Sequence, residues 1–381
     1  MNPSISSGFD SGAVETISCS NNGSCADFVL RIRKDSHSDF RQWFHFRLSD
    51  ARGLACALRF ENAGACTYPS GWTDYRVVAS YDRSRWFRVP TRYDGGAMTV
   101  EHTPERDAVW YAYFEPYSLE RHQVLIGRAG DSPLARTERL GASVEGRDMD
   151  LITAGTGNGA KRTIWIIARQ HPGETMAEWF VEGMLERLLD RSDPVSRRLL
   201  ERATFHVVPN MNPDGSVRGN LRTNAAGANL NREWTDPGMA TSPEVFLVRE
   251  RMQRTGVDAF LDVHGDEALP YVFVAGGEML PGFTPERAKL QGDFIADFKR
   301  ASPEFQDAHG YPAGKYNQDA LKLASKWIGH TYGCLSLTLE MPFKDNANLP
   351  DPQVGWNGER SRKLGAAVLE PLLATLDRPE G

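Results

Sequence analysis

Several features that mark whole classes of protein are missing from this sequence. It has no run of about 18 apolar residues, so no transmembrane helix is predicted. Its first residues, MNPSISSGFDSGAVETI, have neither a basic start nor an apolar core, so they do not resemble a signal peptide. The formal net charge is −6 and the pI is about 5.9, values that argue against a broad nucleic-acid-binding surface.

Cysteine is scarce as well, and its distribution bears on the cellular compartment. The five cysteines are Cys19, Cys25, Cys56, Cys66 and Cys334, and no pair has the close spacing of a zinc knuckle. An odd and scattered set without a secretion signal favours reduced thiols, so a cytoplasmic location is predicted; a bridge between Cys19 and Cys25 is the alternative. With 40% hydrophobic residues among 381, the chain can bury the cores of two domains without disulfides.

The residues that are present divide the chain into two parts. In residues 1–115, short runs rich in aromatic and β-branched residues are separated by Gly, Asp, Asn and Pro. The runs are DFVLRIR, WFHFRLS, ACALRFENA, YRVVASY, WFRVPTRY, AMTVEHT and AVWYAYFEP. Several of them alternate apolar with polar residues and none has a helical pattern. A small all-β domain, an antiparallel sandwich, is therefore predicted for residues 1–115.

Residues 116–381 follow a different pattern, in which buried strands alternate with helices. Strands are predicted at RTIWIIAR, ATFHVVPNM, VDAFLDVHG and CLSLTLEM, and helices at PGETMAEWFVEGMLERLLD, SPEVFLVRERMQRTG, ERAKLQGDFIADFKRA and LGAAVLEPLLATL. We expect Ser242 to cap the second of these helices, with Pro243 in its first turn. This alternation predicts an α/β domain with a largely parallel or mixed sheet.

Three polar side chains stand where predicted strands end. His171 follows RTIWIIARQ, His264 closes DAFLDV and Glu340 closes CLSLTL. In open α/β sheets, ligands bind just outside the carboxyl ends of the strands, so we expect these residues at one edge of the sheet. Glu174 lies in the same predicted turn as His171, where both can face one metal ion. Imidazole nitrogens and a carboxylate oxygen suit zinc, and catalytic zinc sites usually have three protein ligands, here His171, Glu174 and His264.

Each of these signals is weak by itself. A His-x-x-Glu pair occurs by chance in many proteins, and a strand-end histidine or glutamate is more often an ordinary boundary residue. The strand before Glu340, however, turns Ser336, Thr338 and Glu340 to one face and its leucines to the other, which directs the carboxylate into a polar site. A carboxylate beside an activated water can act as a general base, and this is the role expected for Glu340.

A further segment is rich in arginine and asparagine. It runs from Gly219 to Arg232 and contains Arg222 and Asn231. Such side chains can hold a carboxylate through paired hydrogen bonds. An exopeptidase needs this kind of clamp, because it recognises the end of a chain. Arginines on loops are usually only solvated, so the segment carries weight only together with the other motifs.

Taken together, the motifs resemble those of the zinc metallocarboxypeptidases. The resemblance rests on His171-Pro172-Gly173-Glu174, Asn210-Met211-Asn212-Pro213-Asp214-Gly215, Asn231-Arg232, His264 and Thr338-Leu339-Glu340. The short arginine loop and the all-β leader, with WFRVPTRY and YAYFEPYSLERH, are similar to the cytosolic carboxypeptidase subfamily. The resemblance implies a mixed-sheet carboxypeptidase-like fold, one zinc ion per chain, and removal of the last residue from a peptide or protein with a free C-terminus.

The resemblance also implies roles for individual residues. The implied roles are zinc ligation by His171, Glu174 and His264, catalysis by Glu340 and Arg222, and substrate binding by Asn231, Arg232 and Tyr316. Tyr316 is our choice for the family's mobile tyrosine, with Tyr311 as the second candidate. Asn229 stands where relatives often carry an Asp that bonds to the first zinc histidine. Because an amide lacks the charge, His171 would be a slightly poorer zinc ligand.

The resemblance further implies a preference for a C-terminal glutamate, because several cytosolic carboxypeptidases trim glutamates. Burying a substrate carboxylate without a partner is costly, so the specificity pocket then needs a cation. Lys315, Lys322 and Lys326 precede the Glu340 strand, and on a helix Lys322 and Lys326 would share one face. Lysines with this spacing usually form a solvated face, and relatives with the same catalytic set also remove neutral or basic residues.

Two other functions fit part of the pattern. A zinc amidohydrolase that deacylates small N-acyl amino acids would share the zinc site and the Asn-Arg pair, but it would not need the β-rich leader. A catalytically inactive peptide-binding protein would not need the complete set of His171, Glu174, His264, Arg222 and Glu340. None of the three functions involves nucleic acid or a membrane.

Overall fold

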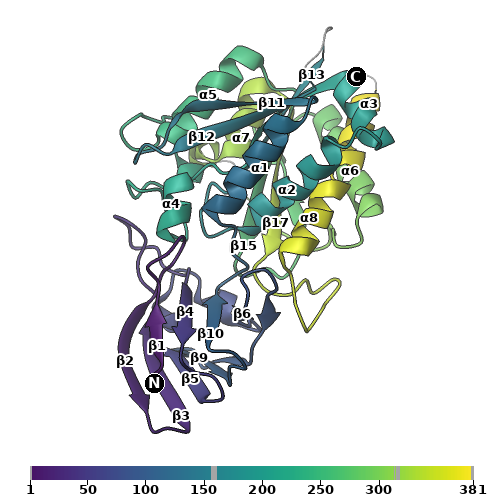
Figure 1. The fold of residues 1–381 in the computed structure, drawn as a ribbon. Helices are drawn as coiled ribbons and strands as arrows, with labels where there is room; N and C mark the ends of the chain where they lie inside the picture. The colour runs from purple at the N-terminus through teal and green to yellow at the C-terminus, as the bar shows by residue number, and fades with distance from the viewer. Residues whose placement is uncertain (1, 156–160, 313, 315–317, 379–381) are drawn as a thin grey trace.

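The computed structural model describes residues 2–155, 161–312, 314 and 318–378. An N-terminal β sandwich lies below a larger α/β unit in the view of Figure 1. No helix within the described ranges is long and apolar enough to cross a membrane. The fold is therefore a mixed α/β architecture preceded by an all-β domain, as the sequence predicts.

The β sandwich consists of two five-stranded sheets. One contains, in spatial order, β1 (Ser4–Ser6), β4 (His45–Ser49), β10 (Ala108–Ala112), β6 (Val78–Ser80) and β7 (Phe87–Arg88). The other contains β2 (Glu15–Asn21), β3 (Cys25–Arg31), β5 (Ala55–Phe60), β9 (Met98–His102) and β8 (Thr91–Tyr93). The ring of Phe60 contacts those of Phe44 and Phe46 across the sandwich, with centroids 4.7 and 6.1 Å apart. Aromatic packing of this kind holds the two sheets face to face.

Two details of the sandwich differ from the prediction. β3 and β5 pair in parallel, so the sandwich is not purely antiparallel. The chain between them passes through β4 in the other sheet and returns in the same direction. β2 was not expected as a strand, because all its residues are exposed and it lies at a sheet edge. A polar sequence is sufficient, and even favourable, at such an edge.

The α/β unit is built on a seven-stranded mixed sheet. Its strands are, in spatial order, β11 (Ala135–Ala142), β12 (Asp148–Ala154), β14 (Ala203–Val208), β13 (Arg162–Ala168), β15 (Ala259–Asp266), β17 (Leu335–Pro342) and β16 (Phe273–Ala275). β14, β13, β15 and β17 are parallel to their neighbours within this group, and the remaining pairs are antiparallel. The parallel strands are nearly continuous apolar runs because helices cover both faces of the sheet.

Helices cover both faces of the sheet, and each face has its own hydrophobic core. The helices are α1 (Leu119–Asp131), α2 (Met176–Leu188), α3 (Pro194–Arg202), α4 (Pro213–Arg218), α5 (Pro243–Thr255), α6 (Pro285–Ala301), α7 (Ala324–Tyr332), α8 (Gly358–Ala367) and α9 (Leu369–Asp377). Short 3-10 turns are η1 (Ala63–Ala65), η2 (Pro69–Trp72), η3 (Leu230–Arg232) and η4 (Gln318–Lys322). Ile164 and Ile166 of β13 face the core that contains α2, whereas Trp165 and Ile167 face the core that contains α5 and α7.

The predicted helices are present, with three corrections. Pro243 begins α5, but the Ser242 side chain does not cap it; its hydroxyl accepts a hydrogen bond from the Gly238 N–H at 3.2 Å. The expected C-terminal helix is two helices, α8 and α9, which are separated at Val368. Lys322 ends η4 whereas Lys326 lies in α7, so the two lysines do not share one helix face.

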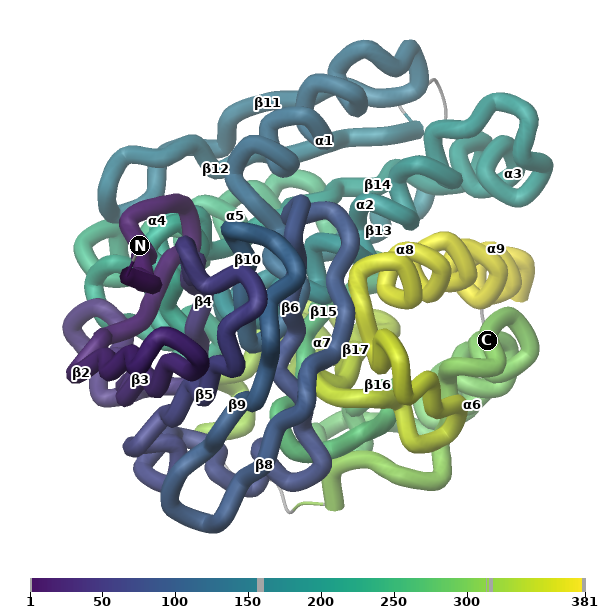
Figure 2. Tube along the Cα trace, turned by 60° about the horizontal axis from the view of Figure 1, so that its bottom comes forward, coloured from purple at the N-terminus to yellow at the C-terminus, as the bar shows by residue number. Residues whose placement is uncertain are grey.

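The β sandwich packs against the α/β unit at the edge where the parallel strands end. In Figure 2, which brings the sandwich forward, its strands lie in front of β15 and β17. The ring of Tyr113, just after β10, stacks on that of Phe343, just after β17, with centroids 4.4 Å apart. The sandwich therefore borders the same edge of the sheet at which His264 and Glu340 lie.

Candidate active site

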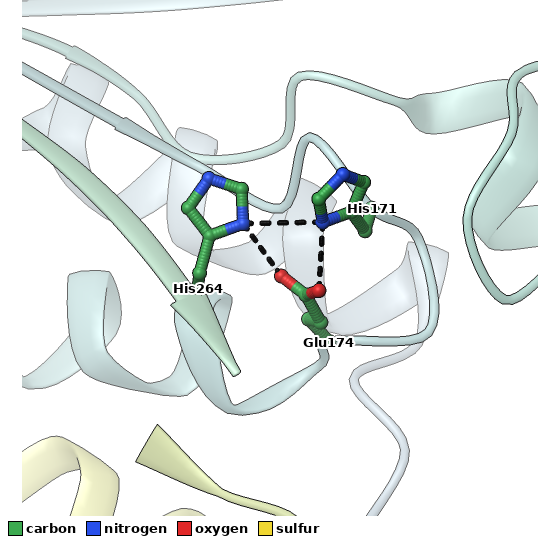
Figure 3. Close-up of side chains that lie close together, drawn as sticks. All are labelled: His171, Glu174 and His264. Carbon is green, nitrogen blue, oxygen red and sulfur yellow. Dashed lines mark hydrogen bonds and ion pairs between the residues drawn. The ribbon is translucent and has the colours of Figure 1, made fainter. Parts of the chain in front are cut away.

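Three metal-ligand side chains meet at the carboxyl ends of the parallel strands. His171 lies in the turn after β13, Glu174 just before α2, and His264 in β15. Nδ1 of His171 lies 2.7 Å from Glu174 Oε1 and 3.2 Å from Nδ1 of His264, which in turn lies 2.7 Å from Glu174 Oε2 (Figure 3). All three side chains are buried, and their ligand atoms lie within 4.8 Å of one another. The structure thus brings together the residues that the sequence selects as metal ligands.

Both histidine rings are held in place by contacts at Nε2, the nitrogen that points away from Glu174. Nε2 of His171 lies 3.1 Å from Asn229 Oδ1, and Nε2 of His264 lies 2.9 Å from Asp262 Oδ2. Each Nε2 contacts a side-chain oxygen, so both rings turn Nδ1 toward Glu174. In metal sites, an outer hydrogen bond of this kind selects the ring nitrogen that binds the metal.

A hydrogen-bond chain extends this support into the core of the α/β unit. Trp234 Nε1 donates to Gln170 Oε1 at 2.8 Å, and Gln170 Nε2 donates to Asp262 Oδ2 at 2.8 Å. Asn229 was singled out by the sequence, but Asp262 and Gln170 were not. Asp262 could have been found, because it lies two residues before His264 and therefore faces the same side of the strand.

The protonation of the three ligand residues fits a cation site. Burial lowers the pKa of His171 to about 3, and the positive charge of Arg222 adds to this effect. Burial alone would also lower the pKa of His264, but the carboxylates of Asp262 and Glu174 raise it. One proton is thus held between His264 and Glu174, at a point where a divalent cation would replace it. Two imidazole nitrogens and a carboxylate are a donor set that zinc favours.

Glu340 lies beside this cluster, with its two carboxylate oxygens in different surroundings. It is the direct neighbour of His264 in the parallel pairing of β15 and β17. Its Oε1 lies 2.9 Å from the Tyr311 hydroxyl, and within the described part of the chain its buried Oε2 has no hydrogen-bond partner. Burial raises the pKa of Glu340, and the negative charges of Glu174 and Asp266 raise it further. A buried carboxylate that gains from accepting a proton is suited to general-base chemistry.

Among the described residues, the tyrosine that reaches the site is Tyr311, the second candidate of the sequence. Tyr316 lies outside them. The Tyr311 hydroxyl lies 2.8 Å from Asp266 Oδ2 and 2.9 Å from Glu340 Oε1, while the side chain is 49% exposed. Burial of its hydroxyl and these two carboxylates raise the pKa of Tyr311 well above its usual range, so it remains a donor.

Arg222 faces the ligand cluster from the loop after α4. Its Nη1 lies 3.9 Å from Glu174 Oε1 and 3.9 Å from Glu267 Oε1, and the side chain is 14% exposed. Burial alone would lower the pKa of Arg222, but the carboxylates of Glu267 and Glu174 raise it, so the charge is retained. Among the described residues, no acceptor takes a hydrogen bond from this guanidinium. Its donors are therefore available to a ligand oxygen.

Asn231 and Arg232 lie in η3, and Asn231 contacts the ligand cluster at His264. Asn231 Oδ1 accepts the Ala324 N–H at 2.9 Å, and its Nδ2 lies 3.4 Å from His264 Nε2. Arg232 is exposed, and one of its nitrogens donates to the Asn231 carbonyl at 2.7 Å. Partial desolvation of the guanidinium and the positive charge of the neighbouring Arg222 lower the pKa of Arg232. Two guanidinium groups close enough to repel each other form a favourable site for an anion.

The three candidate lysines have different surroundings. Lys315 lies outside the described residues. Lys322 pairs with Asp319 at 2.8 Å, and both side chains are largely exposed. Lys326 is 9% exposed, and within the part of the chain that is described its Nζ has no hydrogen bond or ion pair. Burial lowers the pKa of Lys326, whereas the charge of Glu278 raises it.

Similarity to known proteins was found along nearly the whole chain. Residues 5–114 match the family model described as the cytosolic carboxypeptidase N-terminal domain, and residues 128–354 match the one described as zinc carboxypeptidase. The solved structure of a metallo-carboxypeptidase from Burkholderia cenocepacia is 60% identical, with a TM-score of 0.96 over 98% of this chain and 99% of that chain.

Two further relatives extend the comparison. A metallo-carboxypeptidase from Pseudomonas aeruginosa, solved in complex with (2-guanidinoethylmercapto)succinic acid, is 46% identical, with a TM-score of 0.94 over 98% of this chain and 99% of that chain. Mouse cytosolic carboxypeptidase 6 is 26% identical over 351 residues, which cover 83% of this chain and 63% of the relative. Because the zinc carboxypeptidase match alone spans residues 128–354 of 381, the chain belongs to the zinc carboxypeptidase family and is a metal-dependent peptide hydrolase.

Proposed function

We propose that the chain binds one zinc ion through His171, Glu174 and His264 and removes the C-terminal residue of peptides or proteins. The observation that carries the proposal is the convergence of two Nδ1 atoms and one carboxylate at a single buried point. A zinc ion held by these three residues would polarise the scissile carbonyl and activate a water molecule near neutral pH.

Glu340 is proposed as the general base. Its free Oε2 accepts a proton from the attacking water, and the same carboxyl group then passes the proton to the leaving amine. Arg222, whose guanidinium donates to no acceptor among the described residues, stabilises the negative charge that develops on the carbonyl oxygen. The Tyr311 hydroxyl donates a hydrogen bond to Glu340 Oε1, and the side chain is proposed to cover the substrate.

The chain end is proposed to bind between Arg222, Asn231 and Arg232. A terminal carboxylate in this position would relieve the repulsion between the two guanidinium groups. The complex of the Pseudomonas aeruginosa relative supports this proposal, because the name of its ligand includes succinic acid, a dicarboxylate.

A pair of peptides that differ only at the C-terminus tests the exopeptidase activity. The peptide with a free carboxylate should be shortened by one residue, whereas its C-terminal amide should be nearly inert, because the guanidinium of Arg232 is left without its partner. Arg232→Met should lose most of this discrimination. Equal rates for the free and amidated peptides would contradict the proposal. Cleavage of N-acyl amino acids in preference to peptides would instead indicate the deacylase activity.

A preference for C-terminal glutamate is proposed on the basis of Lys326. Ser325 Oγ lies 2.7 Å from Thr338 Oγ1, and Thr338 precedes Glu340 by two residues, so the start of α7 packs beside the catalytic strand. Lys326 follows directly and is buried, and no described residue forms an ion pair with it. An ammonium group in these surroundings gains from the approach of a second substrate carboxylate.

Peptides that end in Glu, Lys, Leu or Phe and are otherwise identical test this preference through kcat/KM. Glu should be the best substrate, and Lys326→Met should remove the advantage. Lys322→Met is the matched control, because Lys322 is exposed and already paired with Asp319, and it should leave the ranking unchanged. A ranking led by Leu or Phe would show that the pocket is apolar.

We also propose a cytoplasmic location and two separately folded units, residues 1–115 and 116–381. All five cysteines are free thiols in the structure, including Cys19 and Cys25, and this agrees with a reducing compartment. The match of residues 5–114 to a cytosolic carboxypeptidase domain supports both proposals and favours the carboxypeptidase over the deacylase activity.

A further inference from the structure

The β sandwich grips the backbone of the loop that carries Arg222. Asp35, between β3 and β4, is 7% exposed. Its Oδ1 accepts the Leu221 N–H at 2.7 Å, and its Oδ2 accepts the N–H groups of Arg222 at 2.7 Å and Thr223 at 3.0 Å. Three consecutive N–H groups around one carboxylate form a concave anion-binding turn. The carboxylate of one part of the molecule thus determines the backbone conformation at Arg222 in the other.

The sandwich also contacts the side chain of Arg222. The guanidinium carbon lies 5.3 Å from the ring centroid of Tyr68 and 5.9 Å from that of Phe40, within the range of a cation–π interaction. The carboxylates of Glu174 and Glu267 lie 3.9 Å from the same guanidinium. Arg222 is therefore held between aromatic rings of the sandwich and carboxylates of the α/β unit.

The rest of the loop is shaped to lie against the sandwich. Gly227 has a φ of +84°, and a Cβ at this position would collide with the carbonyl oxygen of His37. The Ser36 N–H donates to Asn220 Oδ1 at 3.2 Å. Contacts on both sides of Arg222 therefore fix the loop on the same surface.

We propose that the β sandwich is part of the catalytic apparatus, with Asp35, Tyr68 and Phe40 as positioning residues that hold Arg222 toward the metal ligands. This inference rests on the proposed role of Arg222 and adds a function for the N-terminal domain. The guanidinium donates no hydrogen bond among the described residues, so its direction depends on the fixed backbone and the aromatic rings. A donor that is already aligned stabilises the transition state without reorganising during the reaction.

Asp35→Asn tests the backbone half of the proposal. Asn keeps the shape of Asp, but its NH2 group replaces one acceptor oxygen and would then face a backbone N–H group. We expect kcat to fall about 10-fold or more, with KM and zinc content nearly unchanged, because a small misplacement of a catalytic group affects mainly the transition state. Tyr68→Leu, which removes the ring against the guanidinium, should give the same pattern. If both variants keep kcat within about two-fold of the unsubstituted protein, the proposal is wrong.

A double-substitution cycle separates positioning from general destabilisation. Arg222→Ala should lower kcat about 10²-fold or more. If Asp35 acts through Arg222, adding Asp35→Asn to Arg222→Ala should change kcat by less than about two-fold. If the two losses multiply, Asp35 acts by another route and the inference fails.

Arg88→Met is the matched control for a loosened interface. Arg88 also connects the two parts, since its Nε donates to the Val354 carbonyl at 3.1 Å, but it does not contact Arg222. This variant should keep kcat, and a loss equal to that of Asp35→Asn would overturn the inference. If Arg222→Ala itself keeps full activity, the proposed role of Arg222 fails. If Arg222→Ala is impaired but Asp35→Asn and Tyr68→Leu are not, only the positioning inference fails.

Discussion

At the scale of single residues, the two histidines of the ligand cluster are held by unequal partners. His171 is held by the neutral amide of Asn229, whereas His264 is held by the carboxylate of Asp262. A charged partner makes an imidazole a stronger metal ligand. We therefore expect His264 to contribute more than His171 to the retention of zinc.

His264→Ala should accordingly lose most of the bound metal. The substitution removes one of three ligands and also the histidine partner of the buried Asp262, which keeps its hydrogen bond from Gln170. Metal analysis of the purified variant measures the outcome, with about one zinc per chain expected before substitution. His330→Ala is the control, because His330 is exposed on α7, and it should retain its zinc. A metal-replete His264→Ala protein would contradict the assignment of the site.

Glu340→Gln should separate metal binding from catalysis. The amide keeps the hydrogen bond to Tyr311 but cannot accept a proton from water. We expect zinc content to be retained while kcat falls at least about 10²-fold, the usual effect of removing acid–base catalysis. Steady-state kinetics together with metal analysis would measure both. Turnover close to that of the unsubstituted protein would mean that another group is the base.

At the scale of elements, the parts predicted from the sequence are those with a strong and regular apolar pattern. β13 is such a part: its residues from Ile164 to Ala168 are buried on both faces, so the run RTIWIIA alone identifies it. β11 is a half-buried edge strand with the polar sequence ARTERLGA, and it has no comparable signal. α1 is similar, because only His122, Leu125 and Ala129 are buried, and a buried histidine does not extend an apolar stripe.

The candidate site follows the same division. The convergence of His171, His264 and Glu340 could be predicted, because the carboxyl ends of parallel strands meet at one edge of a sheet. Asp35 and Tyr68 could not, because they come from the β sandwich and no local pattern indicates that they approach Arg222. Their position depends on how two separate folds dock, and this information is spread over many contacts.

The histidine in α1 leads to a prediction about pH. His122 Nδ1 lies 2.6 Å from Glu178 Oε1 of α2, and its Nε2 lies 3.0 Å from Asp150 Oδ2 of β12. Burial alone would lower the pKa of His122, but these two carboxylates raise it to about 9 from an ordinary value of 6.5. The protonated His122 therefore makes its full contribution to the stability of the fold at pH values below 6.5. This contribution is lost as the pH rises through about 9.

His122→Gln should therefore be less stable at pH 6, by on the order of 3 kcal/mol. The difference should shrink as the pH rises toward 10, because the neutral histidine then holds the two carboxylates no better than an amide does. Thermal melting of both proteins across this pH range would measure the change in Tm. A difference in Tm that stays constant with pH would show that His122 contributes by packing rather than by charge.

At the scale of the whole molecule, several contacts between the β sandwich and the α/β unit lie beside the site. Tyr113 stacks on Phe343, immediately after the strand that carries Glu340. Lys344 Nζ donates to the Thr73 carbonyl at 2.8 Å. The sandwich therefore borders the site on the side of Arg222 and on the side of Glu340. A change in docking should then reach the chemistry without altering any residue that contacts the substrate.

A substitution at Gly71, which adds a single carbon atom, can test this link between docking and catalysis. It lies in η2, close to Tyr68, and a Cβ added there would be 2.7 Å from the carbonyl oxygen of Glu267, the residue whose carboxylate faces Arg222. Because both sides of this contact are backbone, Gly71→Ala must shift η2 or the segment after β15. We expect lower kcat and lower Tm with zinc retained. Gly8→Ala, whose Cβ would meet nothing within 4 Å, should change neither. If Gly71→Ala lowered Tm but left kcat unchanged, this part of the interface would contribute to stability alone. The rings of Tyr68 and Phe40 would then align Arg222 without support from η2.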